Sequence, residues 1–131
     1  MISSQQYCPI VACAVCEDPA AGPYHRHWFV VDAADRLVTR QSQPRLAEVE
    51  IAIRFGYLAI RGPGMLRMDI PLDVIEDDDS IVRQVVVGSQ RVKIVDEGDL
   101  AAAWVSNFLG TPSRLVKVHP DVATVMWPEG A

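Results

Sequence analysis

The sequence predicts a mainly β fold: a small β-barrel of short, mostly antiparallel strands with one amphipathic helix near the C-terminus, at about residues 99–109. Two observations lead to this prediction. Short runs of β-branched, aromatic and other apolar residues follow one another, separated by glycine, proline and aspartate. One segment instead has apolar residues at helical spacing. Closing the strands into a barrel would bury one face of each strand and leave no free edge.

The strand-like runs extend over most of the chain. We expect extended segments at 6–15, 25–32, 36–39, 47–54, 57–61, 65–70, 81–87, 91–96 and 114–118. Turns are expected at Asp32 to Asp35, because aspartate tolerates turn geometry, and at Phe55-Gly56. Gly88-Ser89 has the composition of a two-residue hairpin turn. The acidic residues Glu76 to Asp79 are expected in a solvated turn.

The helical segment runs from Asp99 to Leu109. Its apolar residues recur at the i, i+1, i+4, i+5 spacing of one helical face: Leu100, Ala101, Trp104, Val105, Phe108 and Leu109. Gly110 can adopt the left-handed conformation that ends a helix, and Pro112 cannot continue one. The pattern therefore predicts a helix with one buried face.

Size and charge restrict the function. The 131 residues, 50% hydrophobic and 22% charged, are expected to form one domain at 1–127 with a tail at 128–131. With 12 basic and 17 acidic residues the net charge is −5, which repels nucleic acid. No apolar run approaches the roughly 20 residues of a membrane span. We expect neither nucleic acid nor a membrane as partner, and the odd count of 3 cysteines favours a reducing, cytoplasmic compartment.

The densest group of functional residue types is Tyr24-His25-Arg26-His27-Trp28. On a strand, His25 and His27 would share one face and Arg26 and Trp28 the other. Arg26 is the best candidate for binding an anion, because a guanidinium offers paired planar donors and keeps its charge. The alternative is an ion pair with an aspartate. Trp28 is more typical of a core anchor than of a stacking platform.

A zinc site is a further alternative. Cys13, Cys16, His25 and His27 form the pattern C-x2-C-x8-H-x-H, which contains suitable ligand atoms but lacks the spacing of known zinc fingers. The other interpretation is that the cysteines are ordinary strand and turn thiols and the histidines are partly exposed. The sequence has no G-x-S-x-G elbow, phosphate-binding P-loop or H-E-x-x-H motif. These motifs therefore identify no enzyme.

Several blocks of the chain carry a family resemblance. They are Cys8 to Cys13, His25 to Asp32, Val38 to Gln41, Pro44 to Ala47, and Asp96 to Gly110 with Arg114 to Val116. In this order and spacing the chain resembles the N-terminal β-barrel domain of MOSC proteins, the relatives of the molybdenum cofactor sulfurase C-terminal region and of the mitochondrial amidoxime-reducing component. The resemblance covers nearly the whole chain.

The resemblance implies a stand-alone barrel without the MOSC catalytic domain. In complete family members the barrel precedes a MOSC domain, which carries the cysteine that binds molybdenum or persulfide sulfur. None of Cys8, Cys13 and Cys16 corresponds to that cysteine, so we assign no catalytic residue. This chain alone is therefore expected to lack catalytic activity.

The resemblance also implies candidate ligand residues. The family holds the phosphate and pterin of the molybdenum cofactor with a lysine and a serine of its first motif, which are Val11 and Ala12 here. Each lost contact would cost on the order of 1–3 kcal/mol, so we expect weakened cofactor binding. Arg26 and Trp28 remain, and the segment Thr39-Arg40-Gln41 completes the expected ligand rim.

Together these observations predict a binding module of molybdenum cofactor or sulfur-transfer chemistry. It would bind a partner MOSC domain or a small anion near Arg26. The alternative is one half of a split molybdenum-cofactor-dependent enzyme, a reductase or sulfur carrier, completed by a separate MOSC domain. A zinc-binding domain is a lesser alternative.

Overall fold

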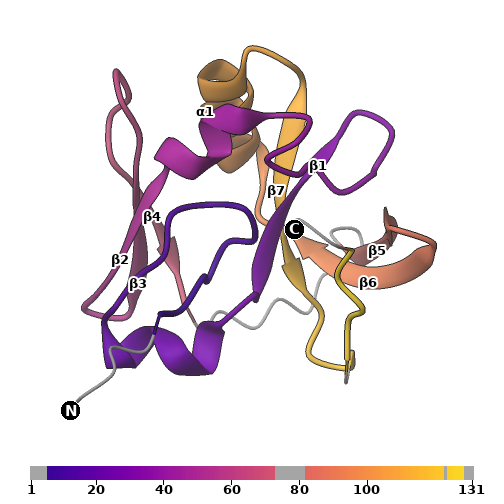
Figure 1. The fold of residues 1–131 in the computed structure, drawn as a ribbon, viewed down its shortest axis with the longest axis horizontal. Helices are drawn as coiled ribbons and strands as arrows, with labels where there is room; N and C mark the ends of the chain where they lie inside the picture. Colours follow the sequence, from indigo (N-terminus) through magenta and orange to yellow (C-terminus); the bar gives the residue numbers. More distant parts are fainter. Residues whose placement is uncertain (1–5, 73–81, 123, 129–131) are drawn as a thin grey trace.

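The structure is a computed structural model that describes residues 6–72, 82–122 and 124–128. Within these ranges it contains seven strands in two antiparallel sheets and one α-helix near the C-terminus (Figure 1). This confirms the predicted mainly β class. The two sheets do not pair with each other along their edges, so the barrel is open.

The larger sheet has the strand order β1-β7-β6-β5 and the smaller one the order β2-β3-β4. The bounds are β1 Trp28–Asp32, β2 Glu50–Arg54, β3 Tyr57–Arg61, β4 Met68–Pro71, β5 Val82–Val87, β6 Gln90–Asp96 and β7 Ser113–Val118. The predicted turn at Phe55-Gly56 joins β2 to β3, with φ of 49° and 81°. Such positive values are those of the tight hairpin turns whose twist matches the strands.

Helix α1 spans Asp99–Leu109, which are the predicted bounds. Gly110 has a φ of 77° and its N–H donates to the carbonyl of Ser106, so it ends the helix as expected. One residue of the predicted apolar face differs, because Leu100 is 88% exposed. The buried stripe is centred on Ala101, Val105 and Phe108, and Leu100 lies at its flank.

The N-terminal third is less regular than predicted. Instead of a strand at 6–15, the chain forms only isolated bridges, between Tyr7 and Cys16 and between Ile10 and Trp28. Ala12 has a φ of 73°, which turns the chain and interrupts extended structure. Two short 3-10 helices, η1 Pro19–Tyr24 and η2 Pro44–Glu48, occupy segments that the sequence indicated only as connections or strand starts.

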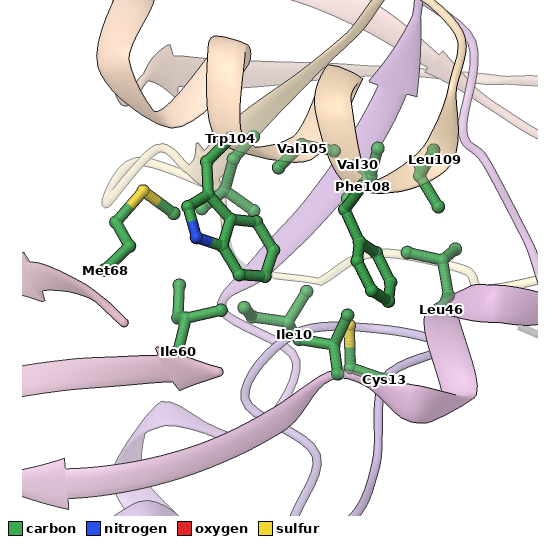
Figure 2. Close-up of a pocket in the computed structure, with 12 residues that line it drawn as sticks. Ile10, Cys13, Val30, Leu46, Ile60, Met68, Trp104, Val105, Phe108 and Leu109 are labelled. Carbon is green, nitrogen blue, oxygen red and sulfur yellow. The ribbon is translucent and has the colours of Figure 1, made fainter. Parts of the chain in front are cut away.

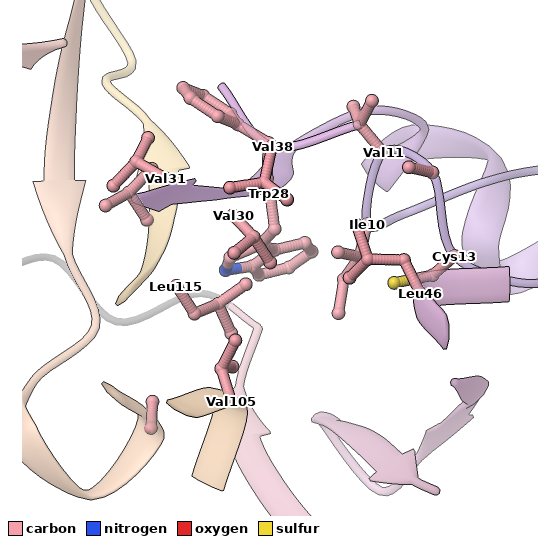
Figure 3. Packing of buried hydrophobic residues seen from close by; sticks show 14 of the residues in the cluster. Ile10, Val11, Cys13, Trp28, Val30, Val31, Val38, Leu46, Val105 and Leu115 are labelled. Carbon is pink, nitrogen blue, oxygen red and sulfur yellow. The ribbon is translucent and has the colours of Figure 1, made fainter. Parts of the chain in front are cut away.

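The core lies between the two sheets and α1, and α1 packs against β7. Its largest fully buried side chains include Trp28 and Phe29 of β1, Phe108 of α1 and Leu58 of β3. Figure 3 shows Ile10 and Cys13 of the N-terminal segment beside Leu46 in this cluster, to which Val11 and Val30 also belong. The irregular segment therefore completes the core without belonging to a sheet.

Two predicted features lie outside the described residues, the acidic turn at Glu76 to Asp79 and most of the tail at 128–131. Across the described ranges, the helix that does form is too short to cross a membrane.

Candidate functional site

Arg26 lies just before β1, not within it. The strand begins at Trp28, and Arg26 has a φ of 55°, with its N–H donating to the carbonyl of Cys8 at 2.8 Å. The predicted strand alternation from His25 to Trp28 is therefore wrong, because the backbone turns at Arg26. This turn places the Arg26 side chain beside Trp127, with Cζ 5.9 Å from the indole centroid.

The Arg26 guanidinium has no acidic partner among the described residues. It is half-buried, and none of the carboxylates in the described part of the chain lies within 4.0 Å of it. The alternative of an ion pair with an aspartate is not formed there. Cation–π attraction to Trp127 at this distance contributes about 0.5–1 kcal/mol at an exposed position, which orients the guanidinium without neutralising it.

His25 adds a second donor beside Arg26. Its Nδ1 accepts a hydrogen bond from the Cys8 N–H at 2.9 Å. Partial burial and the neighbouring Arg26 charge both lower the pKa of His25 below 6.5. The ring is therefore neutral at pH 7, and because Nδ1 accepts, the proton is on Nε2. The exposed imidazole can donate from Nε2 to a ligand.

The Arg40 guanidinium binds backbone carbonyls of the N-terminal segment. Its Nε donates to the carbonyl of Ala12 and its Nη2 to the carbonyl of Cys13, each at 2.7 Å. These carbonyls belong to the turn that Ala12 forms with positive φ. Arg40 therefore closes the N-terminal loop, and this contact gives it a structural role that its position in the sequence did not indicate.

No contact with Arg26 is recorded for Trp28, Thr39 or Gln41 in the described part of the chain. Trp28 is fully buried, and its Nε1 donates to Glu97 Oε2 at 3.1 Å, so it is a core anchor. The carbonyl of Thr39 accepts from the hydroxyl of Ser42 within a tight turn, and Gln41 is exposed. Of the five expected residues, Arg26 alone combines partial burial with a charge that has no partner in the described ranges.

The thiols near this site are held protonated. Burial raises the pKa of Cys8, although Arg40 and Arg26 oppose the shift, and its Sγ donates to the carbonyl of Ile10 at 2.9 Å. Burial also raises the pKa of Cys13, which is 1% exposed. A thiolate is the nucleophilic and metal-binding form of cysteine, so neither thiol is prepared for such chemistry at neutral pH.

The four residues of the zinc pattern are not brought together. Among the described residues no three His, Cys, Asp or Glu side chains are grouped closely enough to hold a metal ion. Cys13 and Cys16 are buried, and His27 packs its ring against Tyr24 and Trp28 at centroid distances of 5.7 and 5.9 Å. The chain turns between η1 and β1, so His25 and His27 are not aligned with Cys13 and Cys16 as they would be on two paired strands.

Two hollows differ in what they could accept. The interior cavity between α1 and the sheets has a volume of about 10 Å³ and is lined by apolar side chains, including Ile10, Trp104 and Phe108 (Figure 2). This is close to the minimum for a single water molecule, so the cavity is a packing gap. A second hollow, of about 390 Å³, opens at the surface beyond Asp32 at the other end of β1.

A buried ion-pair network lies near that second end. Asp96 is 8% exposed and pairs with Arg83 and with Arg114, whose Nε lies 2.7 Å from Asp96 Oδ2. Burial alone would raise the pKa of Asp96, but hydrogen bonds from Arg114, Arg83 and the Gly98 N–H lower it to about 2. Sequence patterns gave no signal for this network, because its members are far apart in the chain.

Comparison with known proteins agrees with the fold. The family model described as the MOSC N-terminal beta barrel domain matches residues 11–112. Molybdenum cofactor sulfurase from Danio rerio is 32% identical over 123 residues, 86% of this chain and 15% of that protein. Mitochondrial amidoxime-reducing component 1 from Xenopus laevis is 29% identical over 99 residues, 74% of this chain and 28% of that protein. The chain thus spans less than a third of either relative.

A solved structure matches along almost its whole length. The solution structure of a protein from Bordetella bronchiseptica is 52% identical, with a TM-score of 0.84 and 98% of each chain covered. The arrangement of sheets and helix described above is therefore shared with a protein of the same size.

Proposed function

The chain belongs to the MOSC N-terminal β-barrel domain family, and from this premise we propose that it is a binding module of molybdenum cofactor or sulfur-transfer chemistry that holds a small anion at Arg26. The observation that carries the proposal is the half-buried guanidinium of Arg26, which has no carboxylate partner in the described residues. A fixed cation without a counterion favours an anionic ligand, particularly when the chain as a whole carries a charge of −5.

The chemistry around Arg26 favours an oxyanion. A guanidinium presents parallel N–H donors that match two oxygens of a phosphate, sulfate or carboxylate. His25 can add one N–H donor from Nε2 while it remains neutral. The Trp127 indole supports one side of the guanidinium. The ligand would therefore be held by two consecutive residues at the start of β1.

The residues of this chain do not fit the molybdenum cofactor as its sole protein host. Val11 and Ala12, which replace the lysine and serine implied by the family resemblance, are 1% and 4% exposed. The carbonyls of Ala12 and Cys13 are occupied by Arg40. One guanidinium and one imidazole are too few donors for a phosphate and a pterin, so a separate chain would have to supply the remaining contacts.

The first experiment is a titration of the protein with inorganic phosphate at low ionic strength, in which binding is monitored by NMR. We expect saturable shifts at the backbone amides of His25 to His27 in the wild type and at least a tenfold weaker affinity in Arg26→Ala. Arg91→Ala is the matched control, because Arg91 is exposed on β6 with no ion pair among the described contacts. An affinity that Arg26→Ala leaves unchanged would refute the anion site.

A second candidate function is one half of a split molybdenum-cofactor-dependent enzyme. It is favoured by the relatives that the chain matches, a molybdenum cofactor sulfurase and two amidoxime-reducing components, of whose lengths the chain spans 15%, 28% and 27%. A purified MOSC domain on a separate chain should then form a stable complex with this protein in light-scattering chromatography. With added molybdenum cofactor and an added electron donor, reduction of an amidoxime to the amidine and water by the mixture, but by neither component alone, would establish this function, and two separate peaks would contradict it.

We also propose a cytoplasmic location. All three cysteines are free thiols, and two of them are buried. A reducing compartment keeps such thiols unpaired, and fractionation of cells that express the protein would test this.

A further inference from the structure

We propose that a second binding site, for a guanidinium or alkylammonium group, lies in the surface hollow at the C-terminal end of β1. The hollow has a volume of about 390 Å³, within the range of small-ligand sites. Its walls are Asp32, Ala33, Ala34, Val38, Ser42, Gln43, Thr111, Pro112 and Ser113. The proposal does not depend on the anion site, because Arg26 precedes β1 and Asp32 ends it.

Five of the eight backbone N–H groups that line the hollow are used within the protein. The N–H groups of Asp32, Ala34, Val38, Gln43 and Ser113 all donate within the protein. The bond from Val38 to the carbonyl of Val30, for example, is 2.8 Å long, and Pro112 has no N–H at all. In the described ranges the N–H groups of Ala33, Ser42 and Thr111 have no acceptor, but an anion that approached them would be repelled by the Asp32 carboxylate in the same hollow.

Three polar side chains of the hollow also donate a hydrogen bond within the protein. The Ser42 hydroxyl donates to the carbonyl of Thr39 and the Ser113 hydroxyl to the carbonyl of Thr111, both at 3.1 Å. The Gln43 Nε2 donates to Thr111 Oγ1 at 3.2 Å. Gln43 Oε1 remains as an acceptor for a ligand, and the second Nε2 hydrogen of Gln43 and the hydroxyl hydrogen of Thr111 remain as donors.

Asp32 supplies an uncompensated negative charge. Its Oδ1 accepts from the N–H groups of Ala34 and Arg36 at 2.8 and 3.1 Å, which leaves Oδ2 available. Within the described ranges, no lysine, arginine or histidine nitrogen lies within 4.0 Å of this carboxylate. The nearby aspartates Asp35 and Asp96 do have arginine partners, so of these three described aspartates Asp32 is the one without an arginine partner.

These observations define the class of ligand. A site with an unpaired carboxylate and amide and carbonyl acceptors matches a cation that carries several N–H donors. The methyl and ring surfaces of Ala33, Val38 and Pro112 can accept a short apolar stem, in the way that lysine and arginine stems lie along apolar surfaces. We therefore assign the hollow to a cationic group on an alkyl chain.

The test uses the whole protein and three probes of similar size: butylguanidinium, butylammonium and neutral butanol. In NMR titrations the two cations should give saturable shifts at the amides of Ala33, Ala34, Thr111 and Ser113, at least tenfold stronger than butanol. Asp32→Asn keeps an oxygen for the two turn N–H groups but removes the charge, and should weaken cation binding at least tenfold. Equal affinity in Asp32→Asn, or equal binding of butanol, would overturn the proposal.

Two control variants and a fourth probe test how specific this site is. Asp69→Asn is the matched control, because Asp69 is a partly exposed carboxylate on β4 that is paired with Arg67, and it should leave cation binding unchanged. Arg26→Ala should remove phosphate binding without affecting the cations, so either site can fail alone. The fourth probe is N-acetyl-arginine-N′-methylamide. If it binds as tightly as butylguanidinium, the natural ligand is an arginine of a protein partner. If it binds much more weakly, the natural ligand is a free small amine.

Discussion

The two ends of strand β1 offer ligands opposite chemistry, although only five residues separate them. Before the strand, Arg26 and His25 present donors and a positive charge with no carboxylate partner among the described residues. After the strand, Asp32 and Gln43 present acceptors and a negative charge. The comparison shows that the sign of each site follows from which local hydrogen-bonding groups the fold has already used.

The reason lies in the local backbone. At Arg26 the chain turns with a φ of 55°, and the side chain leaves the strand alternation and reaches Trp127. At Asp32 the carboxylate caps a turn and binds two N–H groups through one oxygen, which leaves the other oxygen available. The donor of Arg26 thus lies just before β1, and the available acceptor of Asp32 lies at its last residue.

The largest expected effect is on stability, and it concerns the buried Asp96 near the end of β1 at Asp32. Asp96 holds Arg114, which lies opposite Val31 in the sheet, and Arg83, which also contacts Asp35 of the turn after β1. Asp96→Asn should lower the free energy of unfolding by about 3 kcal/mol, because it leaves two arginines without their buried charge partner. Urea denaturation measures this.

Asp99→Asn is the control for that variant, since Asp99 pairs with the same Arg114 but its side chain is 96% exposed. A surface ion pair contributes about 0–1 kcal/mol, so this variant should be nearly as stable as the wild type. Equal losses for both variants would show that Asp96 is no more important than a surface carboxylate.

The next effect is a loss of stability in acid, caused by protonation of Asp96. Hydrogen bonds lower the folded pKa of Asp96 from 3.8 to about 2, so its contribution to stability is present above pH 4 and is lost as the pH falls through about 2. The wild type should lose about 2 kcal/mol of unfolding free energy from this group between pH 4 and 2. Urea denaturation at several pH values should show that the difference in unfolding free energy between wild type and Asp96→Asn becomes smaller over this range. A constant difference would contradict the lowered pKa of Asp96.

A smaller effect tests whether Arg40 stabilises the fold or belongs to the proposed anion site at Arg26. Arg40→Ala should cost about 1–3 kcal/mol, because the carbonyls of Ala12 and Cys13 lose a charged donor. The reaction rate of Cys13 with a thiol reagent should rise with it, while the phosphate affinity of the folded protein should stay unchanged. Arg91→Ala should alter none of these. A weakened phosphate affinity without loss of stability would instead make Arg40 part of the ligand site.

The smallest effect is a change in titration. Because partial burial and the Arg26 charge both lower the pKa of His25 below 6.5, Arg26→Ala should move its NMR titration midpoint upward. The sign follows from removing a positive charge that disfavours a second one. Arg91→Ala should leave the midpoint in place, and an unmoved midpoint in Arg26→Ala would place the guanidinium away from the imidazole.

Regular elements were predictable where local chemistry agreed with the fold. The bounds of α1 follow from the apolar spacing and from Gly110, and the β2–β3 hairpin follows from Phe55-Gly56. The N-terminal segment was not, because β-branched residues at 6–15 favour extended structure while their actual pairing partners are single residues such as Trp28. Leu100 was misplaced because spacing alone does not say where the contact face of a helix ends.

The sequence by itself determined the class of fold and the family, since periodicity, turn residues and residue order are all local properties. Only the tertiary structure decided what each charge does. Arg40 closes a loop 27 to 28 residues away, and Asp96 joins two arginines 13 and 18 residues away. Whether a charged side chain is available to a ligand depends on which partners the fold brings to it, and those partners are distant along the chain.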